Sequence, residues 1–223
     1  GNSMLKIIKT TETQLVELKP ENIESGAWIS LIRPTADELN EVEDITGAPQ
    51  DFVRSALDPE ESSRIEIEDN NILVLINVTV NHDSNISEYD TLPLGIIITP
   101  DYFVTVCQEH NDVIQNFSES RFRYFNTWKR TRFLFQILYR SAMLFLKDLR
   151  QMTRRSDQIE QDLRQSMKNA ELFQLLDLQK GLTYYSMSLR SNKVVVERLL
   201  RLCSNSQVSH LITFRGEDEA LLD

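Results

Sequence analysis

The stretch LGIIITPDYFVTV, residues 94–106, decides the fold of this chain of 223 residues. It lies within two apolar runs, Pro93–Thr99 and Tyr102–Gln108, which Pro100-Asp101 separates. A Pro-Asp pair is typical of a tight turn. The three isoleucines of one run and the Phe-Val-Thr-Val of the other are continuous rather than alternating, as in strands that are buried on both faces. The stretch therefore predicts a hairpin at the centre of a sheet, not a membrane span of ~18 apolar residues.

Upstream of this hairpin, the sequence predicts a strand and two helices. Ala27–Arg33 is a largely apolar run, and the proline after it ends the strand. Thr35 and Glu38 have the Thr-x-x-Glu spacing of a capping box, in which each side chain bonds the backbone of the other residue. The helix that they begin is expected to end near Gly47. Pro49–Leu57 predicts a second, short helix with proline in its first turn.

Further strands are predicted on both sides of these helices. Leu5–Lys9 and Leu15–Leu18 are short candidates. Arg64–Asp69 alternates between charged and apolar residues, and the pair Asn70-Asn71 separates it from the β-rich run Ile72–Val80. An asparagine pair between two such runs is typical of a β-hairpin.

After about residue 110, the spacing of apolar residues becomes helical. Two series step alternately by three and four residues: Leu138, Ala142, Phe145, Leu149, Met152, Ser156, Ile159 and Leu163, then Leu175, Leu178, Leu182, Tyr185, Leu189, Asn192, Val196, Leu199 and Cys203. Two such stripes joined near Met167 predict a long antiparallel helical hairpin. Ser156 and Asn192 interrupt the stripes, either to fix the register of the helices or as solvated positions at the rim.

Together these patterns predict an α+β fold, with a mixed sheet flanked by helices and followed by the helical hairpin. The charge changes at the same place in the chain. Residues 1–120 hold 6 Lys and Arg against 23 Asp and Glu, a net charge of −17, whereas residues 121–223 hold 18 against 11, a net charge of +7. We therefore expect an acidic α/β domain at 1–120 and a long-helix domain at 121–223, which attract each other within a chain or between neighbouring copies.

The sequence contains no catalytic motif that we can identify. Cys107 and Cys203 are far apart, and neither has a second cysteine or a histidine at ligand spacing, so we expect two buried free thiols. With six glycines in the chain, there is no glycine-rich phosphate loop, and no Ser-His-Asp order is present. We expect no enzyme activity.

Two acidic clusters are candidates for binding a divalent cation. Asp58, Glu60 and Glu61 either bind one, because hard cations prefer carboxylate oxygens, or form an acidic turn between a helix and a strand. Asp157 and Glu160 share a helical face near the tip of the hairpin. Arginines surround this second pair, which favours ordinary ion pairs over a metal site.

The segment RFRYFNTWKRTRF, residues 121–133, interleaves five basic with five aromatic residues and contains no acid. This composition suits contacts to phosphates and stacking on bases. The alternative is that the segment begins a long helix, with its aromatic side chains buried against the sheet and its basic groups facing the acidic domain. We expect no nucleic-acid partner, because a chain of net charge −10 repels nucleic acid.

Four stretches, taken in order, resemble segments of one known family. The strand Trp28–Leu31 followed by Pro34–Glu38 is similar to that family's entry into its first long helix, and Glu60–Asn70 is similar to its stretch of arginine, glutamate and further acids before an apolar strand. Leu94–Val106 resembles its paired strands ending in Val-Thr-Val, and Leu175–Leu202 resembles its returning helix. The family is the CorA-like divalent metal ion transporters, and the likeness covers nearly the whole chain.

CorA-like proteins are homopentameric channels for divalent cations, mostly Mg²⁺, with a zinc-transporting branch. The resemblance implies that this chain is the regulatory funnel domain of such a transporter, on the cytoplasmic face of the cell membrane, and that its partner is itself in a pentamer. It also implies that GEDEALLD, residues 216–223, begins the stalk helix, and that the membrane spans follow beyond this chain. Mg²⁺ or Zn²⁺ would then be a regulatory ligand.

The metal-binding residues that the resemblance implies are incomplete. In family members that sense Mg²⁺, two adjacent acids often precede the arginine-containing turn, and counting back from Arg64 places that pair at Arg54 and Ser55. The aspartate near the top of the stalk helix falls on Asp223, which therefore lacks its usual partner. The metal candidates are thus Asp223, Asp58, Glu60 and Glu61.

One alternative function needs no transport. In this interpretation the chain is a soluble interaction module that docks partners on its helical hairpin. A native stop codon soon after Asp223 would favour the module, whereas two further apolar segments of ~20 residues would favour the transporter.

Overall fold

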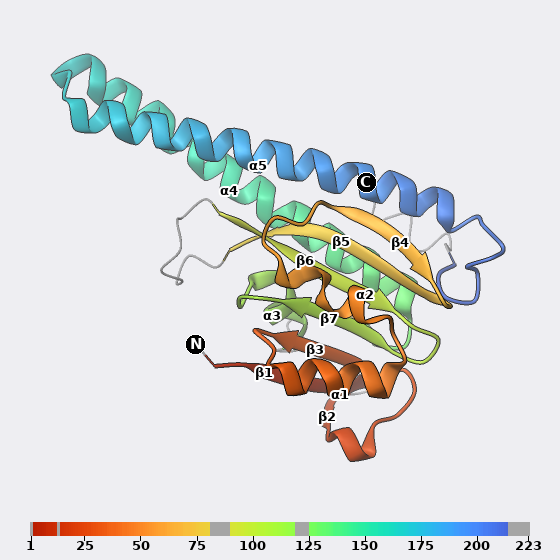
Figure 1. Ribbon diagram of the computed structural model, residues 1–223. Coiled ribbons are helices and arrows are strands. Elements are labelled where there is room, and N and C mark those ends of the chain that lie inside the picture. The colour runs from red at the N-terminus through yellow and green to blue at the C-terminus, as the bar shows by residue number, and fades with distance from the viewer. Residues whose placement is uncertain (1, 13, 81–89, 119–124, 214–223) are drawn as a thin grey trace.

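A computed structural model describes residues 2–12, 14–80, 90–118 and 125–213 of the chain. Its strands form one seven-stranded mixed sheet in the order β2-β1-β3-β7-β6-β5-β4, and helices cover both faces of that sheet (Figure 1). Among the described strands, β3 and β7 run parallel and the other neighbours are antiparallel. The bounds are Met4–Thr10 (β1), Leu15–Leu18 (β2), Trp28–Ile32 (β3), Arg64–Glu68 (β4), Asn71–Thr79 (β5), Thr91–Ile98 (β6) and Phe103–Cys107 (β7).

The helices fall into two layers. One face of the sheet packs on α1 and α2, and the other face packs on α3, α4 and the C-terminal half of α5. The bounds are Ala36–Thr46 (α1), Gln50–Arg54 (α2), Asp112–Ser118 (α3), Arg130–Ser166 (α4) and Asn169–Leu202 (α5), with short 3₁₀ turns at Pro20–Asn22 (η1) and Ser55–Leu57 (η2). The predicted α+β fold is confirmed, while the division of the chain at residue 120 stays a prediction.

The predicted hairpin at residues 94–106 lies at the centre of the sheet. Strands β6 and β7 pair with each other, and β7 also pairs with β3 while β6 pairs with β5. The turn between them is held by Thr99, whose hydroxyl accepts a hydrogen bond from the Tyr102 N–H at 2.9 Å. Both strands are almost completely buried, as their continuous apolar runs predict.

The capping box that begins α1 is confirmed. The Glu38 N–H donates to Thr35 Oγ1 at 3.2 Å, and the Thr35 N–H donates to Glu38 Oε1 at 2.8 Å. Gly47 ends the helix with a φ of +69°, a left-handed conformation that glycine adopts without the strain of a Cβ atom. The boundaries of α1 are therefore set by local chemistry.

The β4–β5 hairpin differs from the prediction by one residue. Its turn consists of Asp69 and Asn70, which have φ values of +49° and +63°, whereas Asn71 belongs to β5 and pairs with Glu68. The predicted Asn70-Asn71 turn was wrong because Asp and Asn both tolerate positive φ. The side-chain amide of Asn71 instead donates to the Glu68 and Asp69 carbonyls, at 3.2 and 2.8 Å.

The long helical hairpin is confirmed. Helices α4 and α5, of 37 and 34 residues, pack antiparallel and meet at Met167, which has a left-handed φ of +48°. Beyond the sheet they continue as a projecting arm (Figure 1). Among the described helices, none combines the length and apolarity that crossing a bilayer requires.

The two cysteines are buried and free, as predicted. Cys107 ends β7 in the middle of the sheet, and Cys203 follows the last turn of α5.

Candidate functional site

The acidic candidates Asp58, Glu60 and Glu61 lie in the turn between η2 and β4. Asp58 Oδ1 accepts the Glu60 N–H at 2.9 Å, and Glu61 Oε2 accepts Arg64 Nη1 at 2.6 Å. Burial lowers the pKa of Arg64, but its ion pairs with Glu61 and Glu66 outweigh that effect, so that its pKa is raised. Two of the three candidate carboxylates thus hold the turn together, and metal binding by them stays a prediction.

Arg54 and Ser55, at the positions of the family's usual acidic pair, make contacts of their own. Arg54 Nε donates to Glu43 Oε1 and its Nη2 donates to Asn40 Oδ1, each at 2.9 Å. The Ser55 hydroxyl is buried and donates to the Phe52 carbonyl at 2.8 Å. The guanidinium of Arg54 on α2 therefore already neutralises the carboxylate of Glu43 on α1. In the described part of the chain, no group of three His, Cys, Asp or Glu side chains is arranged to hold a metal.

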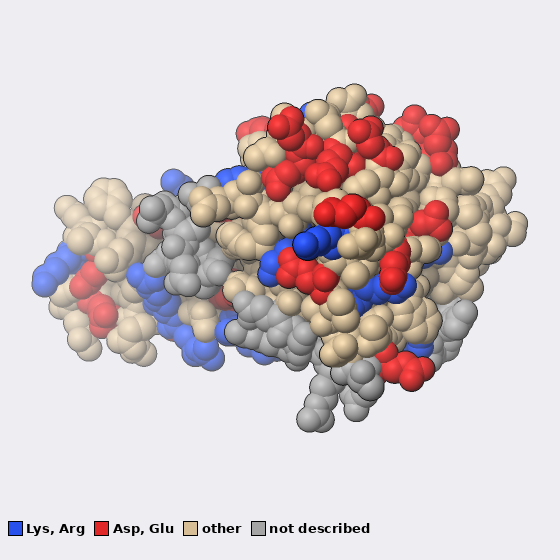
Figure 2. All heavy atoms as spheres, turned by 90° about the horizontal axis from the view of Figure 1, so that it is seen from below, with Lys and Arg blue, Asp and Glu red and all other residues tan. Residues whose placement is uncertain are grey.

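A shallow acidic groove of about 520 Å³ lies between η1 and α1. Its lining includes Glu21, Asp37, Glu41 and Asp44, and acidic side chains gather over this side of the molecule in Figure 2. None of the four forms an ion pair with another described residue, whereas the neighbouring Glu43 does. The groove is therefore a site of uncompensated negative charge.

Two of the five aromatic residues of the basic segment, Phe125 and Phe133, belong to the core, as the second interpretation predicts. Residues 121–124 lie outside the described part. The rings of Phe125 and Phe133 are buried, and that of Phe133 lies 5.1 Å from Trp28 and stacks on Phe103 at 4.4 Å between centroids. Trp128 is half exposed. These buried rings are not available for stacking on bases.

Arg130 begins α4 and binds carbonyl groups rather than acids. Its guanidinium donates to the Thr99 carbonyl, to the Pro100 carbonyl at 2.8 Å and to the His210 carbonyl at 3.1 Å. Burial lowers the pKa of Arg130, while the nearby Asp101 opposes the shift. Arg130 therefore anchors the first turn of α4 to the β6–β7 turn.

Asn192, one of the two polar breaks in the heptad stripes, is buried and binds the sheet. Its Oδ1 accepts the Asn77 N–H at 2.8 Å, and its Nδ2 donates to the Asn77 carbonyl at 2.7 Å. Because β4 begins at Arg64, which pairs with Leu75, it leaves β5 at Asn77 without a strand partner on the β4 side, while Asn77 pairs with Pro93 of β6 on the other side. Asn192 replaces that partner and docks α5 on β5. It is neither a solvated rim position nor a contact that sets register against α4.

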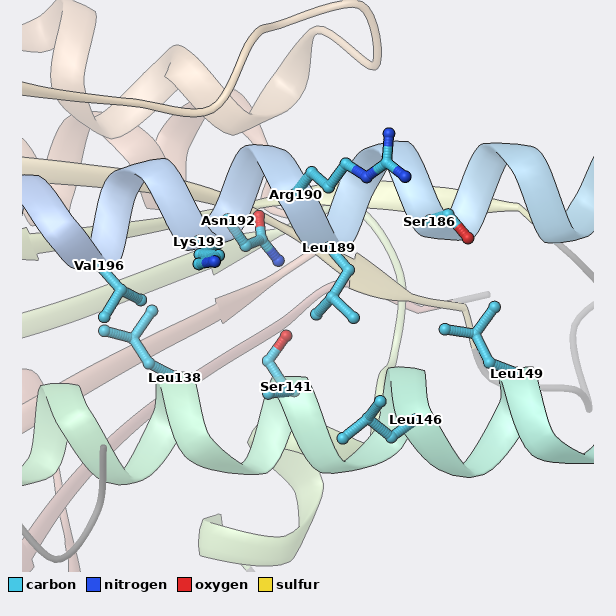
Figure 3. A pocket seen from close by; sticks show the side chains of 11 residues that line it. Leu138, Ser141, Leu146, Leu149, Ser186, Leu189, Arg190, Asn192, Lys193 and Val196 are labelled. Atoms are coloured by element: carbon cyan, nitrogen blue, oxygen red, sulfur yellow. The ribbon is translucent and has the colours of Figure 1, made fainter. Parts of the chain in front are cut away.

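Two serines complete this polar cluster. Ser63 Oγ accepts the Asn77 side-chain amide at 2.9 Å, and Ser141 on α4 donates to the Asn77 carbonyl at 3.4 Å. The cluster lies beside an apolar groove of about 490 Å³ between α4 and α5, in which Leu138 and Leu149 of α4 point towards α5 and Leu189 and Val196 of α5 point towards α4 (Figure 3). In the sequence, the asparagine at an apolar heptad position indicates that Asn192 has a special role. Its partner Asn77 could not be identified there, because it lies 115 residues away.

Comparison with known proteins agrees with this architecture. The family described as "CorA-like Mg2+ transporter protein" matches residues 24–213. The chain belongs to this family. Among curated proteins, none matches the chain.

Several solved structures share the fold. The soluble domain of CorA from Methanocaldococcus jannaschii has a TM-score of 0.78 and 19% identity, over 98% of this chain and 84% of that one. The complete CorA magnesium transporter from the same organism has the same score and identity, over 98% of this chain and 67% of its own. The ZntB cytoplasmic domain from Vibrio parahaemolyticus has a TM-score of 0.54 and 12% identity, over 88% of this chain and 96% of that one.

The family assignment confirms the resemblance inferred from the order of strands and helices. CorA-like proteins are ion transporters rather than classical enzymes, and nothing described in this domain indicates catalysis. The candidate Asp223 lies outside the described residues, as does the segment GEDEALLD that contains it.

Proposed function

We propose that this chain is the cytosolic regulatory domain of a CorA-like divalent-cation transporter whose cargo is Mg²⁺. One observation carries the proposal, namely the match of residues 24–213 to the CorA-like Mg²⁺ transporter family. The likeness of the fold to the soluble domain of CorA supports it. The place of action is the cytoplasmic face of the cell membrane.

The charge of the domain supports regulation by cations. Residues 1–120 carry a net charge of −17, so neighbouring copies in an oligomer, a pentamer in the full-length protein, repel each other through these parts. A divalent cation bound between carboxylates of adjacent copies reduces that repulsion and favours the closed arrangement. Loss of the cation then favours opening.

The candidate ligands are Asp223 and the turn carboxylates Asp58, Glu60 and Glu61. Glu60 is exposed and has no ion pair among the described residues, so it is the carboxylate of the turn most accessible to a cation. Position 54 contributes no ligand because its guanidinium already pairs with Glu43. Mg²⁺ is the expected regulator, and Zn²⁺ is the second candidate because carboxylates also bind it.

The test of transport is cation uptake by cells that lack their own Mg²⁺ uptake system and express the gene encoding this chain. We expect saturable Mg²⁺ uptake. Absence of uptake of both Mg²⁺ and Zn²⁺, with the protein present in the membrane, would contradict the proposal. The coding sequence after Asp223 gives an independent check, since a transporter requires apolar segments of ~20 residues.

The test of regulation is the Mg²⁺ concentration that inhibits uptake. Glu60→Gln combined with Glu61→Gln should raise that concentration, because each substitution removes a carboxylate charge while preserving shape. Glu12→Gln combined with Glu68→Gln removes two exposed charges elsewhere and should leave it unchanged. Equal responses of the two variants would show that the turn is not a regulatory site.

A further inference from the structure

Helix α4 carries a row of basic side chains on the face that points away from the α4–α5 seam. Arg140, Met143, Lys147, Arg150 and Arg154 follow one another at steps of three, four, three and four residues, so they share one face. The last three cations are exposed, and Met143 is 38% exposed between them and Arg140. We call Lys147, Arg150 and Arg154 the basic stripe.

The basic stripe has no acidic partner within the described part of the chain. None of its three cations forms an ion pair there, although Arg164 further along α4 pairs with Glu160. Arg140 adds to the same face, and its Nε is buried without a hydrogen-bond partner among the described residues. Figure 2 shows lysine and arginine side chains along the projecting hairpin. This face of α4 therefore carries positive charge that no ion pair with a described residue compensates, and the exposed Met143 lies among the cations.

Helix α1 carries the opposite pattern. Asp37, Glu41 and Asp44 lie on one exposed face at steps of four and three residues, and we call them the acidic stripe. They line the acidic groove, and half-buried Ile45 lies beside them. No described residue forms an ion pair with them.

The two stripes match in length and in number of charges. Lys147 and Arg154 are seven positions apart, as are Asp37 and Asp44, which is about 10 Å along a helix. Three cations therefore face three carboxylates when the helices lie side by side.

The two stripes cannot meet within one copy. Helix α1 packs on one face of the sheet through Leu39 and Val42, whereas α4 packs on the opposite face through Phe133 and Ile137. Figure 2 likewise shows the acidic gathering and the basic hairpin in different regions of the surface. An attraction between these two stripes can therefore act only between copies.

We propose that the basic stripe of α4 docks on the acidic stripe of α1 of a second copy of this chain. The proposal rests on the self-association that the proposed function requires, and it names the surfaces. The contact joins two different surfaces, and each copy carries both of them. A series of such contacts therefore forms a closed ring of copies when the rotation between neighbours permits. Exposed ion pairs contribute little individually, so the association is weak, needs several pairs together and falls as salt rises.

The experiment is sedimentation velocity of the full chain over a range of concentrations, at ionic strengths of about 0.02 M and about 0.5 M. One variant carries Asp37→Lys, Glu41→Lys and Asp44→Lys, and a second carries Lys147→Glu, Arg150→Glu and Arg154→Glu. All six positions are exposed, so the fold is expected to survive, and circular dichroism checks this. The matched control carries Glu12→Lys, Glu17→Lys and Glu68→Lys, with the same change in net charge as the first variant.

At low salt we expect the wild type and the control to associate, and each stripe variant to associate at least tenfold more weakly. Mixing the two variants, or combining all six substitutions in one chain, restores opposite charges across the contact and should restore association. Three results would overturn the proposal: a wild type that stays monomeric at low salt, a control that weakens as much as the first variant, or a mixture that does not recover. A basic stripe that binds a single-stranded oligonucleotide while the chain stays monomeric would assign it to nucleic acid instead. Sedimentation measures this contact and cation uptake measures transport, so the failure of one is distinguishable from the failure of the other.

Discussion

The two halves of the helical hairpin bury their apolar residues in different ways. The half near the sheet packs on several neighbours at once, because its residues join a core that also includes β3–β7 and α3. Within the described part of the chain, the core of the projecting half contains residues of α4 and α5 alone. Its core is a single row along the seam, formed by Phe145, Met152, Ile159, Leu178 and Tyr185.

This difference implies different local stabilities. Regions with few buried contacts open at a lower free energy than the core of the same domain. At the tip, Met167 is 80% exposed and Phe173 is 64% exposed, whereas Phe133 near the sheet is completely buried. We therefore expect the projecting half to open without unfolding the sheet, so that an α4–α5 arm can move on a fixed domain.

The largest expected effect comes from Phe133→Ala in the half near the sheet. The Phe133 ring contacts four aromatic rings at centroid distances of 4.4 to 5.3 Å. Its truncation should lower the free energy of unfolding by about 3–5 kcal/mol, measured by urea denaturation. Tyr184→Ala removes a ring that is 55% exposed on α5 and should cost less than about 1 kcal/mol. Similar costs for the two variants would show that the sheet does not anchor α4 as described.

Met152→Ala tests the projecting half. Met152 is 2% exposed in the seam, and its truncation should cost about 2–4 kcal/mol of local stability. Hydrogen exchange should accelerate in the helix segments around residues 145–185 and stay unchanged in β6 and β7. Met187→Ala, at a 62% exposed position, is the control. Equal acceleration in the sheet would mean that the hairpin and the sheet unfold as one unit.

Cys107 gives the sheet core a dependence on pH. Burial raises the pKa of the Cys107 thiol from 9.0 to about 11. The folded state therefore disfavours the thiolate, and this stability is complete below pH 9 and is lost as pH rises towards 11. Two pKa units correspond to about 2–3 kcal/mol.

Urea denaturation at pH 8 and pH 10.5 measures the effect. The wild type should lose more stability between these pH values than Cys107→Ala, because the variant has no thiol at this position to titrate. Identical losses in the two proteins would show that Cys107 does not contribute to the alkaline instability.

Asn192→Ala tests the contact that joins the near half to the sheet. The substitution leaves the Asn77 N–H and carbonyl without their partner, which should cost about 1–3 kcal/mol. Asn192→Asp can accept from the N–H but cannot donate to the carbonyl, so it should not restore stability. Lys193→Ala, at the neighbouring exposed position, should change the free energy of unfolding by less than about 0.5 kcal/mol. An Asn192→Ala variant with an unchanged free energy of unfolding would mean that water replaces the side-chain amide.

The sequence predicted those features that depend on local pattern. The hairpin at 94–106, the capping box at Thr35 and the heptad stripes all follow from spacing over a few residues. The role of Asn192 could not be predicted, because its partner is the backbone of Asn77 on β5, at a place that the neighbouring strand β4 does not reach. The β4–β5 turn was shifted by one residue, since Asp69 and Asn70 suit positive φ as well as Asn70 and Asn71 do. The proposed contact of the basic stripe with a second copy could not be inferred from the sequence, because it depends on α1 and α4 lying on opposite faces of the sheet.

Apart from the control substitutions, Arg54→Glu has the smallest expected effect on stability, and it lies on the face of the sheet away from the hairpin. It replaces a partly exposed ion pair with two carboxylates beside the Asn40 side chain, and should cost about 1 kcal/mol without added metal. Carboxylate and amide oxygens are the ligands that Mg²⁺ prefers, so Mg²⁺ should recover that stability in this variant by binding the folded state. Thermal unfolding with and without Mg²⁺ measures this, and Arg54→Gln, which loses the ion pair without adding a charge, should not respond to Mg²⁺. If Arg54→Glu and Arg54→Gln respond equally, the guanidinium does not stand in for a cation at this position. Hydrogen exchange in both halves of the hairpin should remain that of the wild type, because the sheet separates Arg54 from α4 and α5.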